Sequence, residues 1–110
     1  MSKKSLCCPV ETTLAIIGGL WKALILRELL GGTRRFNELH RALAGVTHRT
    51  LTQQLRELQA HRVIRRKVYR QVPPKVEYSL TPLGEGLKSV LDVMHQWGEQ
   101  YPHRLTGKKR

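Results

Sequence analysis

The sequence predicts a mainly α-helical domain with one small β-hairpin. Apolar residues recur at helical spacing through most of the chain, whereas strict alternation is confined to a short stretch that ends near residue 80. Glycine pairs at 18–19 and 31–32 divide the first half into separate segments. A chain of 110 residues suits one modest core. The expected order is helix, helix, short strand, helix, helix, hairpin, helix.

The first two helices are expected before residue 31. "PVETTLAII" begins with Pro9 near the first helical position, where its missing N–H costs nothing. "LWKALILRELL" follows as a strongly apolar helix that should lie in the core. A short extended piece at 33–35 then leads into the next pair of helices. Residues 1–6 are expected to be a flexible tail, residues 7–103 the domain, and residues 104–110 a basic tail.

Two short helices separated by the turn "AGV" form the centre of the sequence. "FNELHRAL" places Phe36, Leu39 and Leu43 on one face. "VTHRTLTQQLRELQAH" has Thr47 as a candidate N-cap and leucines at i, i+4 and i+7. These lengths and the turn glycine are typical of a helix-turn-helix, whose second helix enters the DNA major groove.

A hairpin is expected after the helix pair. The run from Val63 to Val72 mixes basic and apolar residues, and "KVEYSL" returns with alternation. Val76, Tyr78 and Leu80 should face inward, with Lys75, Glu77 and Ser79 outward. "VPPK" lacks the Asn or Gly of a tight turn, so a broader loop held extended by prolines is expected. Such a stiff projecting loop is a candidate wing.

The last helix is predicted to run from Pro82 to about Tyr101, with Thr81 as its cap. Its apolar residues follow a 4-3-4-3-4 spacing, which is typical of a helix packed on a partner helix. The stripe therefore predicts a homodimer interface, with packing inside one monomer as the alternative. The stripe consists of Leu83, Leu87, Val90, Met94, Trp97 and Tyr101.

The charge points to a polyanionic partner. The formal net charge is +12, and residues 34–75 hold eleven Lys or Arg against two acidic residues. No apolar run reaches the length of a membrane-spanning helix, and the start lacks the apolar core of a signal peptide, so a cytoplasmic protein with no membrane partner is expected. A solvated basic face is the plainer reading of such a charge run.

The exposed face of the second helix of the pair is the candidate reader of DNA. Arg can pair with guanine and Gln with adenine, while Thr can contact a phosphate or a thymine methyl. The plainer reading is that a surface helix needs polar residues, for which Arg and Gln are good helix formers. The candidate base-reading residues are His48, Arg49, Thr52, Gln53 and Arg56.

The hairpin, together with Arg35 of the short extended piece at 33–35, is the candidate source of contacts to the DNA backbone. Arg35, Arg70 and Lys75 are predicted to meet phosphates or a minor groove beside the helix. The alternative is an edge hairpin that its prolines and charges protect against aggregation.

Four motifs in order resemble one family. "CPVETTLAIIGGLWKALILREL", "RRFNEL", "THRTLTQQLREL" and "VPPKVEYSLTPLG" are similar to motifs of the HxlR-type winged-helix transcriptional regulators of bacteria, relatives of the MarR group. The resemblance covers roughly residues 7–101. It implies a dimeric winged helix in which "THRTLTQQL" reads the major groove, "VPPK" lies in the wing and the terminal helices build the dimer.

Cys8 matches the cysteine of the family's "CPVE" motif, which in some members senses quinones, aldehydes or oxidants. A helix N-terminus in a basic protein favours the reactive thiolate, whereas a small cysteine that simply packs is the alternative. Cys7 is an additional thiol beside it. The five histidines are scattered and have no metal-ligand spacing, so no metal or other cofactor is expected.

The sequence thus predicts a homodimeric, sequence-specific regulator of transcription that binds double-stranded DNA. It is expected to be a repressor on an inverted repeat, with a reactive small molecule as a possible effector. The alternative is a nucleic-acid-binding protein without sequence preference. No arrangement of residues suggests an enzyme.

Overall fold

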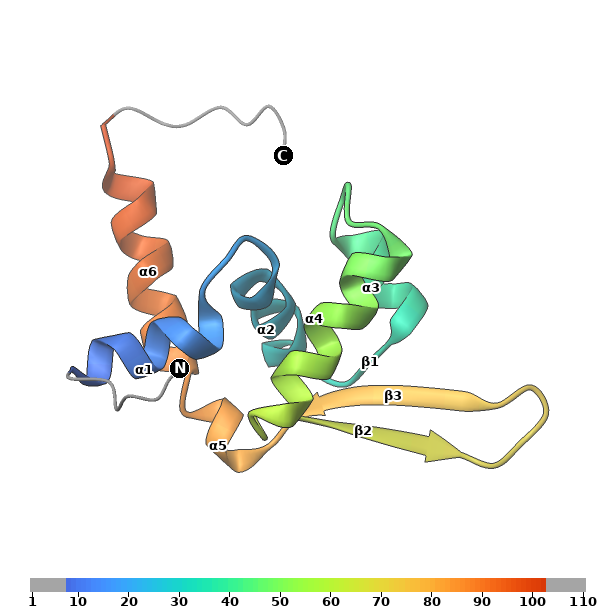
Figure 1. Cartoon of the computed structure of the whole chain (residues 1–110). Coiled ribbons are helices and arrows are strands. Elements are labelled where there is room, and N and C mark those ends of the chain that lie inside the picture. Colours follow the sequence, from blue (N-terminus) through green and yellow to red (C-terminus); the bar gives the residue numbers. More distant parts are fainter. Residues whose placement is uncertain (1–7, 103–110) are drawn as a thin grey trace.

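In the computed structural model, which describes residues 8–102, helices and short strands surround the central helix α2 (Figure 1). Helix α2 contacts α1, α3, α4, α6 and strand β3. This central position explains why Ile25 and Leu26 of α2 are completely buried. The elements are α1 (Pro9–Ile17), α2 (Trp21–Leu30), β1 (Arg34–Arg35), α3 (Phe36–Ala42), α4 (His48–Ala60), β2 (Ile64–Tyr69), β3 (Lys75–Leu80), α5 (Pro82–Glu85) and α6 (Lys88–Gln100).

The boundaries of α1 and α2 follow the residues expected to set them. Pro9 occupies the first turn of α1. The backbone N–H of Gly18 donates to the Leu14 carbonyl at 2.7 Å, and Gly19 follows with φ +86°, a conformation that favours glycine. The chain can therefore turn sharply into α2, whose Ile25, Leu26 and Leu29 are buried.

Helices α3 and α4 form the predicted helix-turn-helix. The turn between them contains Gly45 with φ +92°. The hydroxyl of Thr47 caps α4 by accepting the Thr50 N–H at 3.0 Å. Leu51, Leu55 and Leu58 of α4 are all buried. This packing fixes one face of α4 on the core and leaves the opposite face in solvent.

The three strands form an antiparallel sheet in the order β1-β3-β2. Tyr78 at the middle of β3 lies opposite Arg34 of β1 and Arg66 of β2. Of the three residues predicted to face the core, Tyr78 is buried, while Val76 and Leu80 are partly buried and pack against it. The predicted outward residues of β3 are also only half-exposed, because β3 is the central strand and has a neighbour on each side.

The single last helix predicted for residues 82–101 is wrong, because the structure has two helices there, α5 and α6. Thr81 caps α5 by accepting the Gly84 N–H at 3.1 Å, as predicted. The N–H groups of Gly86 and Leu87 then bond to carbonyls three residues back, at Leu83 and Gly84, which tightens the turn and ends α5. Gly84 itself lies against Val63, so close that an added Cβ would sit 2.0 Å from the Val63 carbonyl oxygen.

The core is continuous from α1 to α6. Its largest fully buried side chains come from α2, α3, α4 and the start of β2, and Leu91 adds α6. The outer half of α6 and the tip of the hairpin project away from this core (Figure 1). Between residues 8 and 102, every helix is too short or too polar to cross a bilayer.

Candidate nucleic-acid interface

The candidate interface consists of the exposed face of α4 and the hairpin β2–β3, which contact each other where β2 leaves the end of α4. Strands β2 and β3 extend well beyond the helices (Figure 1). The loop at the tip is fully in solvent, with Val72 99% exposed. The hairpin therefore has the projecting shape predicted for a wing.

The solvent-facing side of α4, with Arg49, Gln53 and Arg56, presents hydrogen-bond donors. Arg49 and Arg56 are exposed, and no acidic residue in the described chain pairs with either of them. Gln53 is also exposed, but its amide nitrogen donates to Glu57 Oε2 at 2.7 Å. To donate to a base, Gln53 would have to exchange this hydrogen bond.

His48 and Thr52 are less free than the sequence suggested. The His48 ring packs on Phe36 of α3, with ring centroids 4.6 Å apart. The Thr52 hydroxyl donates to the His48 carbonyl at 2.9 Å, so only its lone pairs remain for a ligand. The ring contact connects the start of α4 to α3, and the Thr52 bond removes one hydroxyl donor from the exposed face of α4.

Glu57 is the one acidic residue on α4, and it is neutralised from the core side. Its Oε1 lies 2.5 Å from the Lys22 Nζ of α2, and Lys22 also donates to Gln54. The hydrogen bond from Lys22, followed by that from Gln53, lowers the pKa of Glu57 below its ordinary value of 4.5. The pair joins α2 to α4 and keeps a negative charge from repelling a polyanion.

The predicted wing and backbone residues have different surroundings. Arg70 is exposed and has no acidic partner among residues 8–102. Lys75 is partly covered, because its Nζ lies 3.5 Å from Glu77 and 4.5 Å from the Tyr69 ring centroid. Arg35 is exposed at the end of β1, where its backbone N–H donates to Glu38 at 2.8 Å. Arg35 and Arg70 are therefore both exposed guanidinium groups without an acidic partner in residues 8–102, whereas Lys75 is partly engaged.

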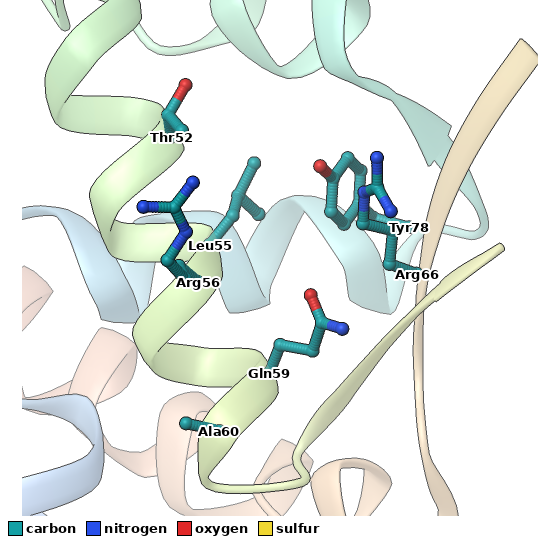
Figure 2. A pocket seen from close by; sticks show the side chains of 7 residues that line it. All are labelled: Thr52, Leu55, Arg56, Gln59, Ala60, Arg66 and Tyr78. Atoms are coloured by element: carbon teal, nitrogen blue, oxygen red, sulfur yellow. The ribbon is translucent and has the colours of Figure 1, made fainter. Parts of the chain in front are cut away.

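A groove of about 600 Å³ separates α4 from the sheet (Figure 2). We call it the α4–wing groove; it is lined by Thr52, Leu55, Arg56, Gln59, Ala60, Arg66 and Tyr78. Sequence reasoning missed Gln59 and Arg66 and assigned Tyr78 to the core alone. Two signals could have identified them: Gln59 follows Thr52 by seven residues on one helix flank, and Arg66 stands two residues from Ile64 on a strand.

The terminal helices carry an apolar surface that differs from the predicted stripe. Leu87 and Val90 pack against the core, and Leu83 lies on α5, off the axis of α6. Met94, Trp97 and Tyr101 remain exposed by 48%, 64% and 41%. The Trp97 and Tyr101 rings stack with centroids 5.5 Å apart. Val10 and Leu14 of α1 are exposed as well.

Cys8 precedes α1 as its N-cap residue and is an exposed free thiol. In the described chain Cys8 is therefore not packed in the core. Cys7 lies outside the described residues.

Comparison with known proteins gives consistent results. A family model described as HxlR-like helix-turn-helix matches residues 16–106. The HTH-type transcriptional regulator YdeP of Bacillus subtilis (strain 168) is 55% identical over 98 residues, which span 89% of this chain and 77% of YdeP. The structure of the redox regulator HypR in its oxidized form matches with a TM-score of 0.82 and 49% identity, covering 87% of this chain and 99% of HypR. A MarR-family regulator from Porphyromonas gingivalis W83 matches with a TM-score of 0.82 and 35% identity, covering 91% of this chain and 98% of that chain.

Proposed function

The chain belongs to the HxlR-like helix-turn-helix family of transcriptional regulators, and from this premise we propose that it is a homodimeric repressor that binds an inverted-repeat operator. In this proposal α4 reads the bases in the major groove and the hairpin is the wing on the DNA backbone. The observation that carries the proposal is the exposed α4 face, on which Arg49 and Arg56 have no acidic partner in the described chain.

We assign base reading to the first turns of α4. Arg49 can donate two hydrogen bonds to guanine, and Gln53 can bond adenine after it releases Glu57. Thr52 contributes through its methyl group and its free lone pairs, because its hydroxyl proton is already donated to the His48 carbonyl. The His48 ring is held by Phe36 at the start of α4. Arg35, Arg70 and Lys75 supply contacts to phosphates, which raise affinity without sequence preference.

A homodimer is supported by the exposed apolar residues of the terminal helices. Met94, Trp97 and Tyr101 form an exposed patch on the projecting half of α6, where no other part of residues 8–102 covers them. A two-fold dimer would place two copies of α4 about one DNA turn apart. The operator should then be an inverted repeat.

We further propose that oxidants or electrophiles control DNA binding through Cys8. The thiol is exposed at the start of α1, which packs on α2, and α2 is joined to α4 by the Lys22–Glu57 pair. HypR, a structurally similar protein, is a redox regulator and has been seen in oxidized and reduced forms. A modified Cys8 could therefore shift α4 through elements that are in contact.

The test is a competition of DNA sequences. A duplex should be selected from a random pool by the purified chain, and its affinity compared with that of random DNA in mobility shifts. We expect the selected duplex to bind at least about 10³-fold more tightly. Arg49→Ala should reduce the free-energy difference between the two duplexes by about 1–3 kcal/mol. Arg70→Ala should weaken binding to both duplexes equally and lower the slope of log affinity against log salt concentration by about one. Equal affinity for selected and random DNA would instead show a nonspecific nucleic-acid-binding protein, the class that the net charge of +12 alone would favour.

A further inference from the structure

The α4–wing groove has features of an anion site, and of its lining residues only Thr52 and Arg56 were assigned to the DNA-reading face above. It has an apolar floor, formed by the buried Leu55 and the Tyr78 ring, and a polar margin on both sides. In Figure 2 the Gln59 side chain extends from α4 toward the sheet, and the Arg66 guanidinium lies beside Tyr78. Polar groups from two separate elements therefore converge on one open groove.

Arg66 is an exposed residue on the side of β2 that faces α4. It lies directly opposite Tyr78 in the sheet, so it faces the same side as that buried ring. Ile64, two residues earlier on the same side of β2, is 2% exposed. The Arg66 side chain is itself exposed, so its guanidinium lines the open groove instead of entering the core.

The groove has positive charge without a counter-charge. Neither Arg56 nor Arg66 pairs with an acid within residues 8–102. The nearest acidic residue in sequence to Arg56, Glu57, is already held by Lys22. Two guanidinium groups with free donors on one groove favour an anionic oxygen ligand.

The Tyr78 hydroxyl provides a second and independent observation. Tyr78 is only 8% exposed, yet its hydroxyl makes no hydrogen bond within the described residues. Buried tyrosine hydroxyls usually have a partner. Figure 2 shows the oxygen pointing from the ring toward the groove and Leu55. A ligand in the groove would complete this missing hydrogen bond.

The position of the groove indicates where the anion comes from. When a helix lies in the major groove and a wing lies at the adjacent minor groove, the sugar–phosphate strand between them must pass between helix and wing. On the proposed function, the α4–wing groove would be that passage. A groove of about 600 Å³ is far larger than a free phosphate ion needs and is open to solvent, as a continuous DNA strand requires.

Resting on the proposed function, we propose that the α4–wing groove binds one phosphodiester of the DNA strand that passes between the recognition helix and the wing. Arg66 and the Tyr78 hydroxyl donate to its oxygens, with Gln59 as a further donor and Arg56 contributing its charge. This site fixes the spacing between α4 and the wing on DNA, whereas the outward residues of α4 fix the sequence. The competing explanation is that Arg66 protects β2, an edge strand, against aggregation.

The test combines single substitutions in the protein with single uncharged phosphate replacements in the DNA. Duplexes selected from the random pool would each carry one methylphosphonate, which lacks the phosphate charge. We expect the wild-type chain to lose about tenfold affinity at one linkage in each half-site. Arg66→Gln should lose about tenfold with unmodified DNA and nothing further at that linkage, because the two changes remove the same interaction. Tyr78→Phe should lose less affinity for unmodified DNA than Arg66→Gln, and its further loss at the modified linkage should be smaller than that of wild type.

Arg65→Gln is the matched control, since Arg65 is an exposed arginine of the same strand on its opposite face. It should keep the full sensitivity to the neutral linkage. The proposal is overturned if Arg66→Gln and wild type respond alike at every linkage, or if Arg66→Gln only increases aggregation. It is also overturned if titration with inorganic phosphate alone shifts the NMR resonances of the Tyr78 ring to saturation, which would make the groove a site for a free ion.

Failure of the proposed function would be seen separately. If selection enriched no sequence, specific recognition would be wrong, but the groove could still be tested on random DNA. There Arg66→Gln should reduce the salt slope by about one relative to wild type, and Arg65→Gln by less. Equal slopes for the two variants would then overturn the groove assignment.

Discussion

At the scale of residues, Cys8 gives the sharpest prediction about how DNA binding is regulated. Treatment with diamide or a quinone should change the affinity of the wild-type chain for its selected duplex by roughly 5- to 150-fold, the usual range of allosteric coupling. Cys8→Ser should remove this response, because the exposed thiol at the start of α1 is the reacting group. Mobility shifts before and after treatment measure the change.

Cys7→Ser is the control for this experiment, since it removes the neighbouring thiol and leaves Cys8 in place. A response that survives in Cys8→Ser and disappears in Cys7→Ser would move the sensor to Cys7. A response that survives in both would show that neither thiol alone is needed.

Single residues were predictable from sequence where a local rule determines their environment. Thr47 and Thr81 cap helices as expected, because a hydroxyl before a helix satisfies N–H groups that the helix leaves free. The α4–wing groove was not predictable in this way. Gln59 and Tyr78 are 19 residues apart in the sequence, and only the packing of α4 against the sheet brings them together.

At the scale of elements, the Lys22–Glu57 pair should make the attachment of α4 to α2 depend on pH. Folding lowers the pKa of Glu57 below 4.5, so the unfolded chain takes up this proton more readily than the folded one. The stability that the pair contributes is therefore present above about pH 4.5 and is lost as the pH falls through the lowered pKa. Urea unfolding of wild type and Glu57→Gln between about pH 3 and 7 should show curves that converge in acid.

Asp92→Asn is the matched control, because Asp92 forms an i,i+4 pair with Lys88 on the exposed surface of α6. Such a surface pair contributes little, so this variant should follow wild type closely. If Glu57→Gln also ran parallel to wild type down to acid pH, the pair would not join the two helices energetically.

The elements themselves were predicted well except near residue 86. Apolar periodicity continues through Leu83, Leu87 and Val90, and this pattern is the same for one long helix or for two helices with a tight turn between them. The hydrogen bonds of Gly86 and Leu87 end α5, and Gly84 within it lies against the carbonyl of Val63, which precedes β2 and is distant in sequence. A tertiary contact of this kind leaves no local signature beyond the glycine.

At the scale of the whole molecule, the seam predicted for the last helix divides into two parts with different roles. Leu87 and Val90 belong to the monomer core, so the spacing of the apolar stripe overstated the length of the free surface. Met94, Trp97 and Tyr101 stay exposed on the projecting half of α6. The interface that we propose is therefore shorter than predicted, and it is centred near Trp97.

Trp97→Glu should convert the dimer into monomers, because it places a charge where the partner helix would bury an aromatic ring. Sedimentation equilibrium measures the change in mass. Affinity for the inverted repeat should fall by roughly 10²-fold or more, since two linked half-site contacts become independent ones. Val72→Glu is the control: Val72 is 99% exposed at the wing tip, so its substitution should leave the dimer intact. A Trp97→Glu protein that stayed dimeric would move the interface away from α6, and a wild-type monomer bound to a single half-site would refute the homodimer altogether.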